Sequence, residues 1–507
     1  MERKWWTLLL VCVATFMLLL DITVVNVALP DIQRDLGASL SSLQWVVDAY
    51  ALTLASFLLV AGSLGDRLGR RRVFAVGLAI FTFASLLCGL SGDPTVLNLA
   101  RGLQGIGGGA MFATSLALIA QEFEGRERGT AIGAWGASIG GGVAIGPLVG
   151  GLLTEGLGWE WIFFINVPIG LAAVALTATK LANVKASDPQ PIDWAGLVTF
   201  SGALFLLIFG LIRGNAEGWS SAQIVGSLTG AAVLFLAFVV VERRQANAML
   251  DLSLFRKPAF TGVSAVAFAL SAGMFAMFLY ITLYIQNVLG YSPLEAGVRF
   301  IPLTLLSFFV SPIAGKLSAR VPARVLLGVG LGLVGVALLL MRGITPESEW
   351  TTLLPGFIVA GVGIGMVNPG IASTAIGVVS TARAGMASGI NNTFRQVGIA
   401  TGVAGLGAVF QARIGSKLTE LLPNAPSGFD EVVASGGTRA AVEAAPPGTQ
   451  SQVGDAATAA FVASLNEILL IGALVTLAGA VIGFLLVRQR DFVAQPGTEP
   501  APEAAAA

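Results

Sequence analysis

Apolar stretches long enough to cross a lipid bilayer follow one another along almost the whole chain. A transmembrane helix needs about 20 consecutive, mostly apolar residues. Short segments that contain Gly, Pro or charged residues separate the stretches, so each one predicts its own helix. The stretches lie at residues 6–30, 43–64, 73–91, 96–120, 130–154, 161–180, 194–213, 222–241, 259–285, 294–315, 323–341, 351–379, 386–411 and 465–487. The pattern therefore predicts an all-α membrane protein with fourteen transmembrane helices.

The distribution of Lys and Arg predicts how these helices are oriented, because cytoplasmic loops of membrane proteins collect basic residues. With a cytoplasmic N-terminus, the outer segments would hold six basic residues, Arg34, Arg213, Arg342, Arg413, Lys417 and Arg439. Arg101, Arg299 and Arg395 lie inside predicted helices, and the remaining twenty of the 29 basic residues lie on the inner side. We therefore expect both termini in the cytoplasm. No small-residue cleavage site follows the first stretch, so we expect a retained helix.

Composition excludes several classes of function. The chain is 55% hydrophobic and 11% charged, against about 25% charged residues in ordinary soluble domains. Equal numbers of basic and acidic residues, 29 of each, argue against a nucleic-acid partner. Without His, and with Cys12 and Cys88 both in apolar stretches, we expect no metal site and no disulfide framework. No GxxxxGK[ST] loop and no hydrolytic constellation occurs, so we expect neither an enzyme nor a cofactor.

A weak internal repeat divides the chain. GSLGDRLGRRRVF, Gly62–Phe74, follows the second predicted helix, and GKLSARVPARVLL, Gly315–Leu327, follows the tenth. The two loops share Gly, Leu and two Arg positions, but Ala319 stands opposite Asp66. Repeats of this kind are typical of transporters built from two halves that hold the substrate between them.

The repeat predicts the domain organisation. Residues 1–190 should form an N-terminal six-helix bundle and residues 246–490 a C-terminal one, with two inserted helices at 191–245. Residues 413–462, rich in Ala, Gly, Ser, Thr and Pro, should form a long outer loop. The segment 491–507 should be a disordered cytoplasmic tail.

Several motifs in order resemble the major facilitator superfamily, and more closely its fourteen-helix drug:proton antiporter family. GSLGDRLGRRR is similar to the superfamily's signature loop. LDITVVNVALP, LARGLQGIGGG and WEWIFFINVPIG resemble the family's motifs in the first, fourth and sixth helices. The glycine-rich fifth helix resembles the antiporter motif, at Gly133, Gly142, Gly146, Pro147, Gly150 and Gly151. The resemblance covers residues 5–487 and implies a major facilitator fold of two six-helix bundles plus two extra central helices.

The resemblance also implies roles for two of these motifs. The signature loop would be a conformational latch that holds one end of the transporter shut, at Gly62, Asp66, Arg67, Gly69, Arg70 and Arg71. Positive-inside anchoring is the alternative for its arginines, and Asp66 could also accept hydrogen bonds from a facing helix N-terminus. The antiporter glycines would close a leak path, with plain close helix packing as the alternative.

Ionisable residues inside the predicted helices are candidates for proton coupling. Asp21 interrupts an apolar run, and Asp48 and Arg101 lie at comparable outer depths on the second and fourth helices. Such residues usually face a cavity or one another. Asp21, Arg101 and Asp48 could together couple transport to protons: the carboxylates would take up and release the proton, and Arg101 would shift their pKa, as burial does. A static ion pair remains the alternative for Asp21, and a structural role for Asp48.

The candidate substrate-binding residues come from both halves. Family members carry an acid at the position of Asp48, which suggests a counter-charge for cationic drugs. Asn391 and Arg395 share one face of the thirteenth helix, beside Asn392, and could line a central cavity or bridge to backbone carbonyls. A Met and aromatic stripe in the ninth helix could form an apolar wall or simply pack, at Met274, Phe275, Met277, Phe278 and Tyr280.

Together these features predict a proton-coupled exporter of small hydrophobic, in part cationic, compounds in the cytoplasmic (plasma) membrane. We expect a monomer whose partners are the substrate, protons and the lipid bilayer. An envelope adaptor protein stays open as a further partner. The alternatives are a dedicated exporter of one endogenous metabolite, lipid or antibiotic, and a non-transporting membrane sensor or assembly subunit.

Overall fold

The computed structural model describes residues 2–38, 40–182, 191–245, 248–318, 320–380, 383–423, 428–434, 442, 445 and 448–493. These residues form helices joined by turns and loops, and none of them lies in a β-strand. The all-α prediction is therefore confirmed for the described part of the chain. All but the first three residues of the predicted tail, 491–507, lie outside it.

Twelve helical segments of the described chain are long and apolar enough to cross a membrane, and each falls on a predicted stretch. They are α1 (Arg3–Leu36), α2 (Leu40–Leu68), α3 (Arg70–Gly89), α4 (Pro94–Glu122), α6 and α7 (Trp161–Phe164 and Asn166–Lys180), α8 (Trp194–Glu217), α9 (Ala222–Arg244), the run of α10 (Pro258–Leu270), η2 (Ser271–Phe275), α11 (Ala276–Leu283) and η3 (Tyr284–Val288), α14 (Ala323–Leu340), η4 and α15 (Trp350–Leu353 and Leu354–Gly377), α16 (Ala384–Leu421) and α19 (Gln450–Leu486).

Two further predicted stretches are also helical. They fold as α5 (Gly125–Leu157), of 33 residues, and as α13 (Ile301–Leu317), of 17 residues, which follows the short α12 (Pro293–Arg299). Neither belongs to the twelve candidate spans of the described chain. Short helices η1 (Leu252–Arg256), α17 (Phe429–Ala434) and η6 (Gln489–Asp491) lie between or beyond the long ones.

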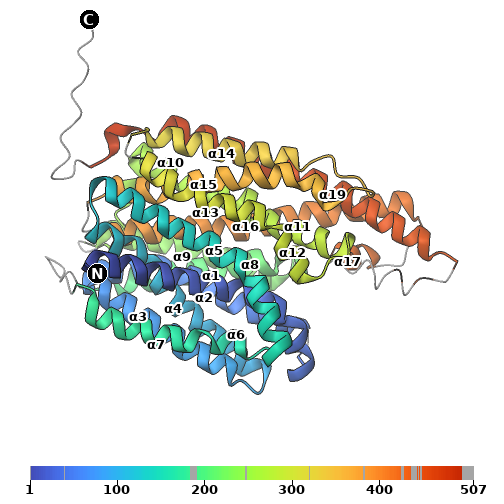
Figure 1. Cartoon of the computed structure of the whole chain (residues 1–507), viewed down its shortest axis with the longest axis horizontal. Helices are drawn as coiled ribbons and strands as arrows, with labels where there is room; N and C mark the ends of the chain where they lie inside the picture. Colours follow the sequence, from blue (N-terminus) through green and yellow to red (C-terminus); the bar gives the residue numbers. More distant parts are fainter. Residues whose placement is uncertain are drawn as a thin grey trace, which may run out of the picture.

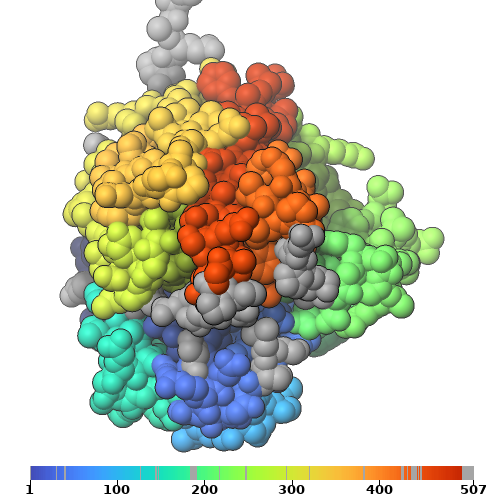
Figure 2. Space-filling model, turned by 90° about the vertical axis from the view of Figure 1, so that its right-hand side faces the viewer, coloured from blue at the N-terminus to red at the C-terminus, as the bar shows by residue number. Residues whose placement is uncertain are grey.

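The long helices form two neighbouring bundles. Figure 1 shows α1 to α7 in one bundle and α10 to α19 in the other, with the helix axes running in the same general direction. The N-terminus lies at one end of this assembly, which we call the N-terminal end. Figure 2, which looks at the opposite end, shows the green α8 and α9 segment at one side of the two bundles.

The helix pair α8 and α9 contacts both bundles. The two helices pack on each other through Phe200 and Phe238, whose ring centroids are 5.0 Å apart. Ser201 Oγ donates a hydrogen bond to the carbonyl of Ser56 on α2, at 3.0 Å. Asn215 Nδ2 on the same helix donates to the carbonyl of Ala404 on α16, at 3.1 Å. The inserted pair therefore bridges the first bundle and the second.

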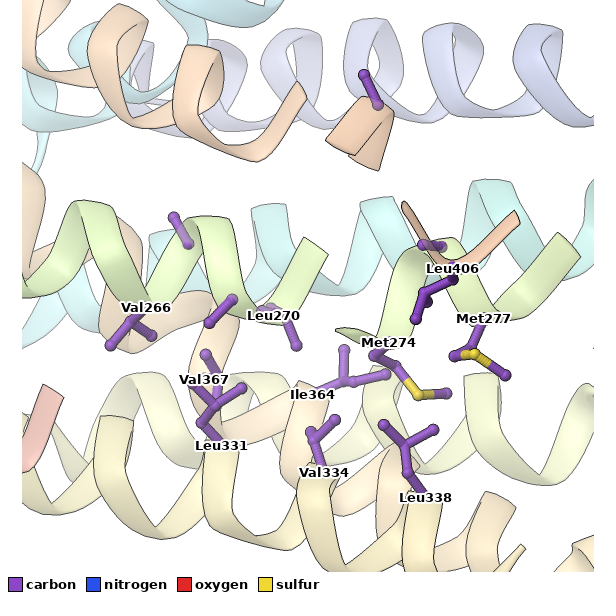
Figure 3. Close-up of a cluster of buried hydrophobic side chains, with 14 of the residues drawn as sticks. Val266, Leu270, Met274, Met277, Leu331, Val334, Leu338, Ile364, Val367 and Leu406 are labelled. Atoms are coloured by element: carbon purple, nitrogen blue, oxygen red, sulfur yellow. The ribbon is translucent and has the colours of Figure 1, made fainter. Parts of the chain in front are cut away.

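The Met and aromatic stripe of the ninth predicted helix divides between the core and a partly exposed surface. Met274 and Met277 are completely buried in the second bundle's core. Figure 3 shows them facing α14 side chains, among them Val334 and Leu338. The packing alternative therefore holds for these methionines, and of this stripe only Phe275 and Phe278 keep partly exposed rings.

The long outer loop predicted over 413–462 is too long at both ends. Helix α16 continues to Leu421, α17 occupies Phe429–Ala434, and α19 already begins at Gln450. These flanking segments combine good helix formers with polar residues, and Lys417 pairs with Glu420 one turn away, at 2.7 Å. The drop in hydropathy marks where the helices become polar and does not mark where they end.

Candidate functional site

A fully buried polar network surrounds Asp21, halfway along α1. Arg101 Nη1 on α4 donates a hydrogen bond to Asp21 Oδ2 at 2.6 Å and forms an ion pair with it. Gln104 Nε2, one turn further on α4, donates to Asp21 Oδ1 at 2.8 Å. Asn166 Nδ2 on α7 donates to the same oxygen at 3.1 Å. Two helices, α4 and α7, thus direct three donors at one carboxylate that is 1% exposed.

Arg101 is held from several sides. Its Nε donates to the carbonyl of Val46 on α2 at 3.0 Å, and its Nη1 also donates to Gln104 Oε1 at 2.6 Å. The guanidinium carbon lies 4.2 Å from the ring centroid of Tyr50, an attractive cation–π distance. Because water does not reach the pair, the attraction between the two charges is strong. The Asp21 charge is therefore balanced by a directly bonded guanidinium inside the first bundle.

Asn166 is a network member that the sequence reasoning missed. Its Nδ2 also donates to Ser85 Oγ on α3 at 3.1 Å, while its Oδ1 is buried without a hydrogen-bond partner. That oxygen is a free acceptor next to the Asp21 carboxylate. The only signal in the sequence was a single amide inside the apolar run FFINVPIG.

Asp48 does not join this network. It is partly buried on α2 and makes no hydrogen bond or ion pair with another described residue. Arg213 on α8 is 8% exposed, and its positive charge acts on the Asp48 carboxylate. Arg213 also donates to Gln44 Oε1 at 2.9 Å and pairs with Glu217 at 2.8 Å. Of the three groups predicted to lie together, the structure pairs Asp21 with Arg101, while Asp48 stays outside the pair and within electrostatic range of Arg213.

The second bundle buries Asn391 and Arg395 in α16, where they are 3% and 9% exposed. Arg395 makes no hydrogen bond or ion pair within the described chain, and its guanidinium lies 5.6 Å from the ring centroid of Phe275. Asn391 Nδ2 also lacks a partner. Asn392 Nδ2 makes a long contact of 3.5 Å with Ser388 Oγ. Arg395 thus reaches none of the described backbone carbonyls.

Asp66 joins the two bundles at the N-terminal end. Its Oδ1 accepts a hydrogen bond from Gly385 N at 3.1 Å, and its Oδ2 accepts one from Met386 N at 2.9 Å. Both donors belong to the first turn of α16, where a negative charge is favoured. Arg70 Nη2 forms an ion pair with Asp66 at 2.8 Å. Gly69, with φ of 102°, makes the turn that brings α3 next to α2.

Two further arginines of this loop, Arg67 and Arg71, donate hydrogen bonds to backbone carbonyls. Arg67 donates to the carbonyl of Pro191 and, at 2.9 Å, to that of Ala248. These two residues flank the inserted helices α8 and α9. Arg71 donates to the carbonyl of Ala178 near the end of α7. Arg67 therefore fastens α2 to the ends of the inserted pair, and Arg71 fastens α3 to α7 inside the first bundle.

Glycine pairs let helices of the two bundles touch at the N-terminal end. A Cβ on Gly62 of α2 would clash with the backbone carbonyl of Gly385 on α16. A Cβ on Gly315 of α13 would clash with the carbonyl of Gly129 on α5. Gly62 and Gly315 are matching positions of the internal repeat. The two crossings are therefore related by the same repeat that relates the bundles.

The antiporter-motif glycines face two different helices. Gly133 meets the backbone of α13 at Pro312. Three others lie one turn apart and face α1, where added Cβ atoms would touch its residues; they are Gly142 against Leu19, Gly146 against Thr23, and Gly150 against Val24. Gly151 has open space around its Cβ position, and the side chain of Pro147 lies outside the described part. The motif thus packs α5 closely against the segment of α1 that carries Asp21.

Comparison with protein families gives one match over most of the chain. A family model described as Major Facilitator Superfamily matches residues 11–403. The tetracenomycin C resistance and export protein of Streptomyces glaucescens is 37% identical over 418 residues, which cover 82% of this chain and 77% of that protein. The multidrug resistance protein Stp of Mycobacterium tuberculosis is 38% identical over 425 residues, 83% of this chain and 79% of its own length.

A solved structure gives the same fold. The human organic anion transporter MFSD10 superposes with a TM-score of 0.60 over 94% of this chain and 100% of that chain. The identity between the two sequences is 15%. At that level the likeness shows the fold alone.

Proposed function

The chain belongs to the major facilitator superfamily, and its relatives include drug-resistance and export proteins, so we propose that it is a proton-coupled efflux transporter. It would carry small hydrophobic compounds out of the cell while protons move in. The relatives point to transport and not to catalysis. The buried Asp21 network is the observation that carries the coupling proposal, because ionisable residues inside membrane helices commonly mark proton or substrate pathways.

The topology belongs to the same proposal. We take α5 and α13 as spans in addition to the twelve candidates, which gives fourteen helices in two six-helix bundles, 1–190 and 246–490, with the pair 191–245 between them. The excess of Lys and Arg supports a cytoplasmic N-terminal end, and the membrane would be the plasma membrane. The working unit would be a monomer.

Proton exchange would depend on the Asp21–Arg101 pair. In the described state, Arg101 neutralises Asp21, and Val46 and Gln104 give Arg101 other acceptors. If the pair loosens as the bundles rock, a proton could replace Arg101 as the partner of the carboxylate. Asn166 Oδ1, which has no partner, could then accept the new O–H. The network can thus satisfy both protonation states of Asp21, as a proton carrier requires.

The antiporter-motif glycines and the signature loop would control the switch between the inward-open and outward-open states of the carrier. The close α1–α5 contact through Gly142, Gly146 and Gly150 leaves little room for a proton leak beside Asp21. Asp66 and its neighbours would hold the cytoplasmic ends together when the carrier faces outward. Such a latch can open because it rests on a few hydrogen bonds at one helix end.

Asp48 would be a second proton-handling carboxylate. We give it less weight as a counter-charge for cationic drugs than the sequence suggests, because Arg213 offsets its charge. Asn391 and Arg395 would contact the substrate from the second bundle. The name of one relative specifies a single antibiotic, so a dedicated exporter of one compound remains the second candidate.

A proton-flux assay tests this function. The purified protein is reconstituted in liposomes containing a pH-sensitive dye, and a panel of cationic, neutral and anionic hydrophobic compounds is added in turn. Transported compounds should cause proton movement in the opposite direction, and a protonophore should abolish their uphill transport. Several responding compounds indicate multidrug export, and one indicates a dedicated exporter. Uphill transport that persists with the protonophore would contradict proton coupling.

Asp66→Asn is expected to weaken the latch and to favour opening of the cytoplasmic end by about tenfold. The substitution removes the charge that binds both Arg70 and the α16 N-terminus, and charge-assisted hydrogen bonds contribute about 1.5–3 kcal/mol. Labelling of single introduced cysteines at each end, in a chain without Cys12 and Cys88, measures the change. Asp93→Asn is the matched control, because Asp93 caps α4 within one bundle. Equal labelling patterns in wild type and Asp66→Asn would leave Asp66 only an anchoring role.

A further inference from the structure

A buried guanidinium without a counter-ion lies in the first half of α16. Arg395 is 9% exposed and has neither a hydrogen-bond acceptor nor a carboxylate partner in the described chain. An arginine side chain stays charged in proteins, and an isolated buried charge is strongly unfavourable. Two buried arginines of the first bundle do have carboxylate partners, since Arg101 pairs with Asp21 and Arg70 with Asp66. Arg395 alone among these three lacks an anion.

A second unpartnered donor lies on the same helix face. Asn391 precedes Arg395 by four residues, which places the two side chains next to each other on α16. Asn391 is 3% exposed, and its Nδ2 has no acceptor. The Asn391 Nδ2 donor without an acceptor and the unpaired Arg395 guanidinium suit a ligand that accepts hydrogen bonds. The positive charge on Arg395 indicates that this acceptor is an anion.

An aromatic surface adjoins this charge. Phe275 closes η2, a π-helical turn, and its ring faces Arg395 at 5.6 Å. Turns of this kind are frequent at functional sites. Phe275 and Phe278 form a ring pair at 5.8 Å, and both are only partly buried. Gly398 holds α16 in backbone contact with Phe268, just before this turn, so the geometry between the helices is fixed.

We infer that Arg395 and Asn391 bind an anionic group, a carboxylate or phenolate, of an amphiphilic substrate whose ring system packs on Phe275 and Phe278. This inference rests on the proposed export function and specifies its substrate class. The guanidinium donates two parallel hydrogen bonds to the anion, and the Asn391 amide donates another. The aromatic pair supplies apolar contact beside the charge. The bound anion neutralises the unpaired charge of the second bundle.

Equilibrium binding of a matched probe series to the purified full-length protein tests the inference. The probes are anthracene carboxylate, its methyl ester and its aminomethyl analogue, which share the ring and differ in charge. The carboxylate should bind wild type about 10- to 100-fold more tightly than the ester, the range for charge-assisted hydrogen bonds. Arg395→Gln should remove this preference, so that the carboxylate and the ester bind this variant with similar affinity. Arg395→Lys should keep part of it, and Asn391→Ala should reduce it less than Arg395→Gln does.

Arg299→Gln is the matched control. Arg299 also lies in the second bundle and faces aromatic rings, Tyr291 and Trp350, but it donates to the carbonyl of Glu295. Its replacement should leave the carboxylate preference unchanged. Asn391→Ala and Arg395→Lys keep the test decisive if Arg395→Gln fails to fold.

Three results would overturn the inference. The first is equal affinity of wild type for the carboxylate and the ester, and the second is an equal loss of both in Arg395→Gln. The third is displacement of the carboxylate probe by chloride alone, with chloride stabilising wild type but not Arg395→Gln, which would assign the site to an inorganic anion. Binding is measured without a pH gradient. A failure of proton coupling in liposomes is therefore distinguishable from a failure of anion binding.

Discussion

Asp21→Asn is expected to abolish uphill export driven by a pH gradient, lowering coupled transport by at least about 100-fold. The amide keeps the shape of the side chain and can still accept hydrogen bonds from Gln104 and Asn166. It cannot bind and release a proton near neutral pH. The expected loss is measured as substrate accumulation in liposomes under an imposed pH gradient, with downhill exchange of the same substrate recorded in parallel.

Because Asp21 is part of an ion pair, the single variant Asp21→Asn could lose transport through lost stability as well as through lost coupling. Removing one partner of a buried pair leaves the other charge uncompensated, at a cost of about 3–5 kcal/mol. The double variant Asp21→Asn/Arg101→Gln restores neutrality in the network and should recover stability without recovering coupling. Asp35→Asn is a control on the same helix, where Asp35 accepts a hydrogen bond from Trp159. If the double variant still exports uphill under a pH gradient, the pair is a static structural contact.

The sequence was most informative where one residue type has few physical alternatives. A carboxylate in an apolar helix requires a partner, and the fourth-helix arginine is the donor that the structure provides. Asp66 likewise stands among arginines at a helix end, and its hydrogen bonds to the first turn of α16 are of the kind that its position suggests. Helix positions also follow from hydropathy, because each span must be about as long as the bilayer is thick.

Other members of the site could not be predicted from the sequence, for physical reasons. Asn166 meets Asp21 only because α7 packs beside α1, and a single amide leaves no periodic signal. Arg213 approaches Asp48 because the inserted α8 lies against α2, which no repeat in the sequence indicates. Hydropathy also misplaced the ends of α16 and α19, because a helix can continue into water after its residues become polar. Tertiary packing decides the first two cases.

Gly62→Ala is expected to shift the carrier strongly toward the state that is open at the cytoplasmic end, and to slow export. The added Cβ would clash with the backbone carbonyl of Gly385, which cannot move aside as a flexible side chain could. Only separation of α2 from α16 relieves the clash, and that separation also removes the hydrogen bonds of Asp66 to α16. Overpacking costs about 1–3 kcal/mol. In the proposed alternation this contact would be broken when the cytoplasmic end opens, so the cost corresponds to a shift of about 5- to 150-fold.

The repeat supplies an independent test of the same crossing. Gly315→Ala should have a similar effect, since its Cβ would clash with the carbonyl of Gly129 on α5. Gly332→Ala on α14 is the neutral control, because open space surrounds its Cβ position. Gly105→Ala is the packing control, since its Cβ would clash with the backbone of Tyr50 within one bundle. It should lower thermal stability without changing the labelling ratio of cysteines at the two ends. A similar labelling shift in Gly105→Ala and Gly62→Ala would mean that general loosening, and not the crossing of α2 and α16, sets the conformational balance.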